Sequence, residues 1–362
     1  MEHLPEPAAM AREAGLIYVS DTSPGIVRQR AGRGFRYLTP QKRWLRDPQQ
    51  LRRIASLAVP PAYRSVWICV NPRGHLQATG RDARGRKQYR YHPEWREMRD
   101  CAKFDRMESF AAALPKLRLR LRRDLSLPGL PRAKVLAAVA SLLSSTAARV
   151  GNLEYARDNH SFGISTLRNR HVSFIKGGRA RLSFVGKGGV SHEIVVDNKR
   201  IAQIVRRCQG LPGQHLFQYL DEAGQRNAID SGQVNDYLRE VMGGDFTAKD
   251  FRTWSATLRA LELLSRIPDA ASLSDAAAKQ AIAGIVKEVA KELRNTPAVC
   301  RKSYINPDLF EAWRAGTIGR HFSGEASLSA RQGEQRVRRF LRARTRQLKT
   351  QGGGSNGRAT RA

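Results

Sequence analysis

A change in hydrophobic period near residue 135 constrains this chain more than any other feature. From that point apolar residues recur at helical spacing, beginning with Val135, Leu136, Val139, Leu142 and Leu143. The same period predicts further helices over residues 201–209, 231–242, 249–264 and 275–293. One segment, His171–Val196, breaks the pattern, because paired glycines at 177–178 and 188–189 divide it into three short strands. The pattern predicts a mainly α-helical domain that contains a three-stranded β-meander.

The residues before this domain follow a different pattern. Residues 1–27 favour loops, whereas Ser65–Val70 and Leu76–Thr79 alternate as strands do, with a turn between them. We therefore expect an α+β fold, with a small β-rich N-terminal domain over residues 1–113 and the mainly helical domain over residues 114–325. The segment 114–132 mixes proline, leucine and arginine, and we expect it to hold the connection between the two domains and the entry to the second one.

The end of the chain is strongly basic. From Ala330 onward it carries ten basic residues against a single acid, Glu334, and it closes on a glycine-rich stretch. This composition predicts a basic helix that becomes a flexible, partly disordered tail over residues 326–362.

The overall charge restricts the class of partner. Lys and Arg total 64 against 32 Asp and Glu, which gives a formal net charge of +32. A field of this sign indicates a polyanion, with nucleic acid first and an anionic membrane second. No apolar run reaches the ~18 residues of a transmembrane helix, and Met1–Gly15 has no signal-peptide pattern. The four cysteines form no CxxC pair, which is typical of reduced thiols and argues against a zinc site. We expect a cytoplasmic, nucleoid-associated protein.

Tyr304 ends a distinctive string, Asn295-Thr-Pro-Ala-Val-Cys-Arg-Lys-Ser-Tyr304. Thr296 can cap a helix and Pro297 suits its first position, so Tyr304 would lie two turns into that helix. A tyrosine without this string around it is far more often a core residue than a nucleophile.

Three cations stand in strings of their own. Arg149 begins Arg-Val-Gly-Asn-Leu-Glu-Tyr155, and Lys187 lies at the expected hairpin tip in Phe-Val-Gly-Lys-Gly-Gly-Val-Ser-His-Glu193. Arg252 lies in Lys-Asp-Phe-Arg-Thr-Trp254. Alone, Arg149 could be a surface charge, Lys187 an exposed lysine in a turn, and Arg252 part of a helix salt bridge with Asp250 or a neighbour.

Together and in this order, these strings resemble the type IB DNA topoisomerases, specifically their compact poxvirus and bacterial branch. The resemblance covers roughly residues 20 to 320. It implies that Arg149, Lys187, Arg252 and Tyr304 are catalytic and that Tyr155 contacts DNA. It also implies the catalytic fold that this family shares with tyrosine recombinases. Lys249 stands where those recombinases usually have histidine, which favours a topoisomerase and a DNA contact by this lysine.

Asn295 departs from the family pattern, since many members have histidine nine residues before the tyrosine. The resemblance still implies a catalytic position. An asparagine can donate a hydrogen bond to a phosphate oxygen, although it cannot carry the charge of an imidazolium.

A second resemblance lies in the N-terminal domain, in Gly-Arg-Lys-Gln-Tyr-Arg-Tyr91. It is similar to the family segment that lies in the DNA major groove, where glutamine can read adenine and Arg or Lys can read guanine. The DNA contacts implied are Arg86, Lys87, Gln88, Tyr89 and Tyr91.

The resemblance implies a monomer that clamps double-stranded DNA, nicks one strand through a 3′-phosphotyrosine, lets it swivel and religates it. No GxxxxGK[ST] phosphate loop is present, and we expect neither ATP nor a divalent metal as cofactor. Two alternatives stay open at this point: a tyrosine site-specific recombinase and a noncatalytic DNA-binding protein.

Overall fold

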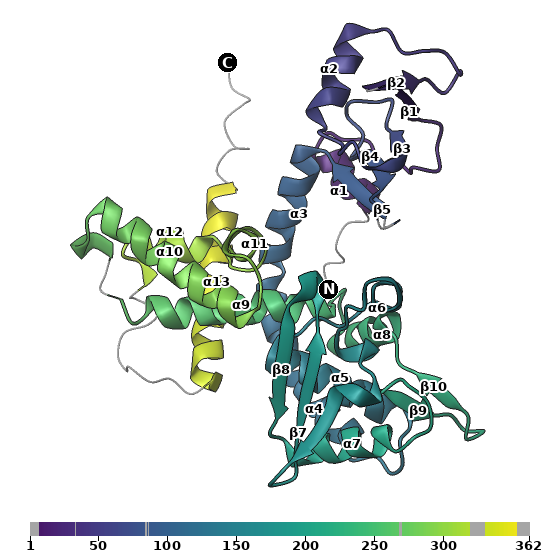
Figure 1. Cartoon of the computed structure of the whole chain (residues 1–362). Helices are drawn as coiled ribbons and strands as arrows, with labels where there is room; N and C mark the ends of the chain where they lie inside the picture. Colours follow the sequence, from purple (N-terminus) through teal and green to yellow (C-terminus); the bar gives the residue numbers. More distant parts are fainter. Residues whose placement is uncertain are drawn as a thin grey trace. The chain divides into compact units, whose positions relative to one another are not determined.

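The computed structural model describes residues 7–32, 34–83, 85, 87–267, 270–318 and 330–352 (Figure 1). Its contacts divide the chain into two compact units, Met1–Phe104 and Asp105–Ala362. The chain combines helices with antiparallel sheets, as expected of a fold of the mixed α and β class.

The first unit is built on a five-stranded antiparallel sheet of order β2-β1-β3-β4-β5. The strands are β1 (Ile26–Ala31), β2 (Gly34–Leu38), β3 (Arg64–Ile68), β4 (Leu76–Arg81) and β5 (Lys87–Tyr91). Its helices are α1 (Pro7–Glu13), α2 (Pro48–Ser56) and α3 (Pro93–Asp105). Ile54 of α2 packs against Ile26, Val66 and Ile68 of the sheet. The loop expected over residues 1–27 was wrong in part, because α1 and the start of β1 lie there.

The second unit is mainly helical. Its helices are α4 (Met107–Leu125), α5 (Arg132–Thr146), α6 (Leu153–Asn159), α7 (Lys199–Gln209), α8 (Ser231–Met242), α9 (Ala248–Leu264), α10 (Asp275–Glu292), α11 (Pro297–Ser303), α12 (Asp308–Arg314) and α13 (Ala330–Gly352). The strands β6 (Val172–Ile175), β7 (Arg179–Val185) and β8 (Ser191–Val196) form the predicted meander, and β9 (Gln218–Leu220) pairs with β10 (Arg226–Ala228).

The segment 114–132 corrects our expectation of a connection between domains. Most of it belongs to α4, which continues to Leu125 with Leu114, Leu117 and Leu121 buried. These leucines recur at helical spacing, so one face of the helix enters the core. That burial outweighs the interruption by Pro115, which removes one backbone hydrogen bond.

The basic end of the chain forms the predicted helix, α13, but this helix is docked on its own unit. It contacts α4 and α9, and Val337, Phe340 and Leu341 are buried. Its charges are paired as well, since Arg342 Nε lies 2.7 Å from Glu108 of α4 and Arg344 lies 3.2 Å from Glu311 of α12. Residues 326–329 and 353–362 of the expected tail lie outside the described residues.

We predict that Phe340→Ala lowers the free energy of unfolding by about 3–5 kcal/mol, the usual cost of truncating a buried aromatic residue. Urea unfolding followed by circular dichroism measures this loss. The matched control is Arg339→Ala, because Arg339 is exposed on the same helix. Equal midpoints for the two variants would show that α13 contributes nothing to the core.

Candidate active site

Tyr304 lies directly after α11. Thr296 Oγ1 accepts a hydrogen bond from Val299 N at 3.3 Å and Pro297 opens the helix, as the sequence predicts. The helix ends at Ser303, however, so Tyr304 ends it rather than continuing it, with φ −130° and ψ −32°. The Tyr304 side chain is half-buried.

Arg252 lies in the first half of α9 and is only 3% exposed. Its guanidinium donates hydrogen bonds to the carbonyls of Ala147 and Leu293, the latter at 3.0 Å. These carbonyls belong to the residues that end α5 and α10. Helix C-termini carry partial negative charge, so two of them stabilise the buried cation. Within the described residues Arg252 forms no ion pair with a carboxylate, so no acidic side chain neutralises its charge by direct contact.

Arg149 lies close enough to Arg252 and Tyr304 for both groups to act on its charge. Burial and the Arg252 charge lower the pKa of Arg149, while Tyr304 acts in the opposite direction. The centre of the Tyr304 ring lies 5.0 Å from Arg252 Cζ. The structure thus brings together three of the predicted catalytic residues.

Several buried donors at these residues have no hydrogen-bond partner within the described part of the chain: Arg149 Nη1, Arg252 Nε and Asn295 Nδ2. Buried polar groups in proteins are almost always paired. Two neighbouring guanidiniums with unused donors suit an anion with several oxygens, because charge-assisted hydrogen bonds are short and strong. A phosphodiester has this chemistry.

Asn295 lies between α10 and α11. Its Oδ1 accepts a hydrogen bond from Thr296 N at 3.2 Å. The amide nitrogen therefore points away from Thr296 N and can donate to another group. The preceding residue, Arg294, donates to the carbonyls of Ser191 at 2.7 Å and Glu193 at 3.1 Å. These two bonds fasten the chain before Asn295 to strand β8.

Lys187 occupies the predicted hairpin tip, in a short 3₁₀ turn between β7 and β8 (Lys187–Gly189), and it is exposed. Its Nζ lies 5.9 Å from the centre of the Tyr155 ring, so these two predicted residues are neighbours. The adjacent Gly186 lies against His192, since a β-carbon at Gly186 would fall 2.6 Å from His192 Nε2.

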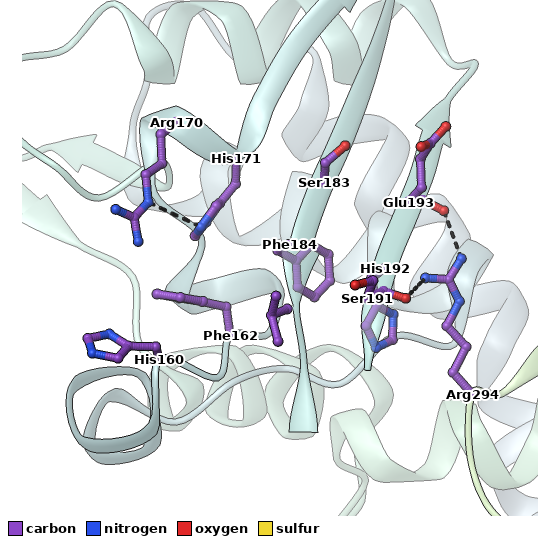
Figure 2. Close-up of a pocket in the computed structure, with 11 residues that line it drawn as sticks. His160, Phe162, Arg170, His171, Ser183, Phe184, Ser191, His192, Glu193 and Arg294 are labelled. Carbon is purple, nitrogen blue, oxygen red and sulfur yellow. Dashed lines mark hydrogen bonds between the residues drawn. The ribbon is translucent and has the colours of Figure 1, made fainter. Parts of the chain in front are cut away.

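His192 is a site residue that sequence reasoning missed. Burial, together with Arg294, Arg149 and Arg252, lowers its pKa to about 4, so its imidazole is neutral near pH 7. The ring stacks on Phe184 with centroids 4.8 Å apart. Both rings line a pocket of about 550 Å³ beside β7 and β8, and Figure 2 shows Arg294 reaching across to β8. The only signal was its place in the Val-Ser-His-Glu string after Lys187.

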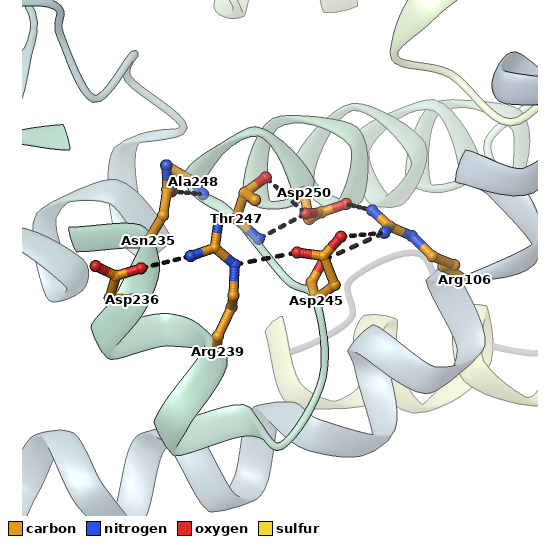
Figure 3. Close-up of polar contacts among 8 residues, drawn as sticks. All are labelled: Arg106, Asn235, Asp236, Arg239, Asp245, Thr247, Ala248 and Asp250. Atoms are coloured by element: carbon orange, nitrogen blue, oxygen red, sulfur yellow. Dashed lines mark hydrogen bonds and ion pairs between the residues drawn. The ribbon is translucent and has the colours of Figure 1, made fainter. Parts of the chain in front are cut away.

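The start of α9 is held by a polar network (Figure 3). Asp250 accepts hydrogen bonds from Thr247 N at 2.8 Å and Thr247 Oγ1 at 2.9 Å, which caps the helix. Arg106, the residue before α4, donates to Asp250 at 3.0 Å. Lys249 is exposed in this first turn, next to the fixed Asp250.

Comparisons with known proteins agree with this arrangement. A family model described as the catalytic core of eukaryotic DNA topoisomerase I matches residues 92–312, and one for the N-terminal domain of bacterial DNA topoisomerase IB matches residues 34–82. DNA topoisomerase 1B of Acanthamoeba polyphaga mimivirus is 34% identical over 286 residues, which cover 78% of this chain and 85% of the viral protein. The chain belongs to the type IB DNA topoisomerase family.

More distant relatives point the same way. DNA topoisomerase 1B of vaccinia virus (strain Copenhagen) and DNA topoisomerase I of monkeypox virus are each 24% identical, over 69% of this chain and 75% of the viral proteins. The family resemblance and the topoisomerase function predicted from the sequence are confirmed. The N-terminal match favours the bacterial branch.

The N-terminal residues that we predicted to contact DNA lie on strand β5 of this topoisomerase. Tyr89 and Tyr91 stack with centroids 5.9 Å apart, and Lys87 Nζ lies 5.5 Å from the Tyr89 ring, so these three share a face. Gln88 points to the opposite face, as strand alternation requires. Two carboxylates already bind this strand, since Lys87 pairs with Asp21 at 2.5 Å and Gln88 donates to Asp82 at 3.0 Å. Arg86 lies outside the described residues.

Within the ranges that the structure describes, no group of three His, Cys, Asp or Glu side chains is arranged to hold a metal ion. None of the described helices of the topoisomerase is long and apolar enough to cross a membrane.

Proposed function

We propose that this topoisomerase cuts one strand of duplex DNA by attack of Tyr304 on a backbone phosphodiester. Tyr304 gives up its hydroxyl proton to solvent, and its oxygen forms a bond to phosphorus as the bond to the 5′-oxygen breaks. This leaves a 3′-phosphotyrosine and, once the leaving oxygen is protonated, a free 5′-hydroxyl. The observation that carries this proposal is the cluster of Arg149 and Arg252 around Tyr304. Among the described residues Arg252 forms no ion pair with a carboxylate, which leaves its charge available to an anionic reaction centre.

The two arginines are suited to stabilise the transition state. Attack adds charge to the phosphoryl oxygens that do not react, and a guanidinium can donate two parallel hydrogen bonds to such oxygens. Preorganised donors of this kind each contribute ~2.7–4 kcal/mol, judged from oxyanion holes. Asn295 Nδ2 adds a neutral donor.

Lys187 is our candidate general acid. The leaving 5′-oxygen would be an alkoxide without a proton, and the ammonium group of Lys187 can supply one. Its exposed position at a hairpin tip suits a side chain that must reach DNA. In the reverse step the 5′-hydroxyl returns its proton, attacks the phosphotyrosine and reseals the strand. Because one phosphoester replaces another, the cycle needs no ATP, and the arginines perform the charge neutralisation for which other enzymes use divalent metals.

We further propose that the enzyme is a monomer whose two units close on the duplex. The charge of +32 supports such a clamp, because every turn of DNA presents phosphates to it. Tyr155, Lys249 and the β5 residues Lys87, Gln88, Tyr89 and Tyr91 would contact the DNA. Swivelling of the cut strand then relaxes supercoils of both signs. We propose that the catalytic domain has the fold that this family shares with tyrosine recombinases.

The test is relaxation of negatively and positively supercoiled plasmid, in EDTA and without ATP. We expect the protein to relax both. Strand exchange between paired sites without relaxation would instead favour a recombinase. DNA binding with neither activity and no covalent adduct would favour a noncatalytic protein.

A further inference from the structure

We propose that Thr257 is a positioning residue for the tyrosine nucleophile, and that its hydroxyl fixes the backbone from which Tyr304 projects. The inference rests on the proposed role of Tyr304 in the function above. Thr257 lies on α9, one turn and a half beyond Arg252, and it is fully buried.

The Thr257 hydroxyl joins two backbone groups on either side of Ile305. Thr257 Oγ1 donates to the carbonyl of Tyr304 at 3.2 Å, and Asn306 N–H donates to the same Oγ1 at 3.1 Å. A hydroxyl has one proton and two lone pairs, so it can make both bonds at once. The sulfur of Met107 lies 3.8 Å from the hydroxyl and is a much weaker acceptor than the carbonyl.

The backbone at Tyr304 needs such a partner because α11 has just ended. The N–H groups of Tyr304 and Ile305 both reach back to the carbonyl of Cys300 at 3.0 Å. The carbonyl of Tyr304 and the N–H of Asn306 are left beyond the helix, in a stretch where Ile305 and Asn306 are buried. Buried backbone groups that lose a partner cost stability and gain freedom to move.

Helix α9 therefore carries one residue for each reactant, the phosphate and the tyrosine. Through Arg252 it presents a phosphate donor, and through Thr257 it holds the main chain of the nucleophile. Five residues of one α-helix separate the two side chains by a rise of ~7.5 Å, and a helix keeps that spacing rigid. A displacement of a reacting group by about 1 Å can cost ~100-fold in rate.

The test compares Thr257→Val, which removes the hydroxyl and keeps the shape, with Thr257→Ser, which keeps the hydroxyl. The substrate is a DNA duplex whose short 5′-hydroxyl fragment dissociates after cleavage, so that the covalent adduct is trapped. The readouts are the single-turnover rate of adduct formation on this duplex and the Kd for it. We expect Thr257→Val to slow adduct formation ~10–100-fold with an unchanged Kd, and Thr257→Ser to react at nearly the wild-type rate.

Thr253→Val is the matched control. Thr253 lies on the same helix and is 2% exposed, but its hydroxyl has no hydrogen-bond partner among the described residues. The same substitution there is expected to leave the rate unchanged. Thermal unfolding shows that each variant is folded at the assay temperature, and Thr257→Ala replaces Thr257→Val if the latter does not fold.

Wild-type adduct formation by folded Thr257→Val would overturn the inference, and so would an equal slowing by Thr257→Ser, which would assign the effect to the methyl group. Neither result touches the proposed function, which depends on the Tyr304 hydroxyl itself. Adduct formation by a Tyr304→Phe protein, in contrast, would contradict the proposed function itself.

Discussion

Replacement of Tyr304 by phenylalanine is expected to abolish both the covalent protein–DNA adduct and plasmid relaxation. The change removes one oxygen, the proposed nucleophile, and keeps the ring that lies 5.0 Å from Arg252. Loss of a nucleophile from a preorganised site lowers rates by roughly 10⁴-fold or more. DNA affinity is expected to remain, because the phosphate donors are intact. Adduct trapped by detergent and resolved on a denaturing gel measures the first effect, and a binding titration measures the second.

Tyr219→Phe is the control for this experiment, since Tyr219 lies on β9, a strand with no residue in the candidate site. It should form adduct at the wild-type rate. Adduct at the wild-type level from the Tyr304→Phe protein would assign the nucleophile to another residue.

The second large effect is expected from Arg252→Lys. This variant keeps the positive charge but loses the planar fork, which donates to Ala147 O, Leu293 O and, as we propose, the phosphate. Removal of one preorganised donor lowers rates by about 10²–10³-fold. We expect a loss of that size in the single-turnover cleavage rate, measured with saturating enzyme so that weaker DNA binding does not contribute.

Folding must be checked separately, because the carbonyls that Arg252 satisfies are buried. A buried acceptor without a partner costs ~1–3 kcal/mol. Arg259→Lys is the control, since Arg259 lies on the same helix and pairs with Glu292 at 2.7 Å and Glu262 at 2.8 Å, away from Tyr304. Cleavage by Arg252→Lys within about twofold of the Arg259→Lys rate would exclude a role for the fork.

The sequence predicts most local structure of the helical unit correctly, since local signals determine it. Helix α8 runs over Ser231–Met242 as expected, because Asp230 and Gln233 form a capping box at one end and Gly243 adopts φ 73° at the other. The meander is equally local, with glycines of positive φ at its turns. The composition of the segment 114–132 was misleading, because its mixture of proline, leucine and arginine suggested a connection, whereas burial of one leucine face makes α4 continuous to Leu125.

The candidate site depends on contacts that no local pattern contains. The resemblance to a family pointed to Arg252, but nothing near it in the sequence predicts its bonds to the ends of α5 and α10. Thr257 carries no motif of its own, and His192 has only its place in the Val-Ser-His-Glu string. Both matter because Tyr304 and the arginines lie close to them in the fold. The docking of α13 was missed for a different reason. Val337, Phe340 and Leu341 recur at helical spacing and are buried, but the many arginines around them suggested a free tail.

Because Arg252 is buried between helix ends, DNA binding and strand cleavage should respond differently to ionic strength. Dissolved ions screen exposed charges over about 10 Å at 0.1 M, but they screen buried interactions much less. Each DNA phosphate that the protein neutralises releases counterions, so the association with DNA weakens steeply as salt rises. The buried guanidinium is stabilised by fixed helix ends, which no ion can replace. We therefore expect salt to set how often this enzyme engages DNA, and to change much less the contribution of Arg252 to strand cleavage after engagement.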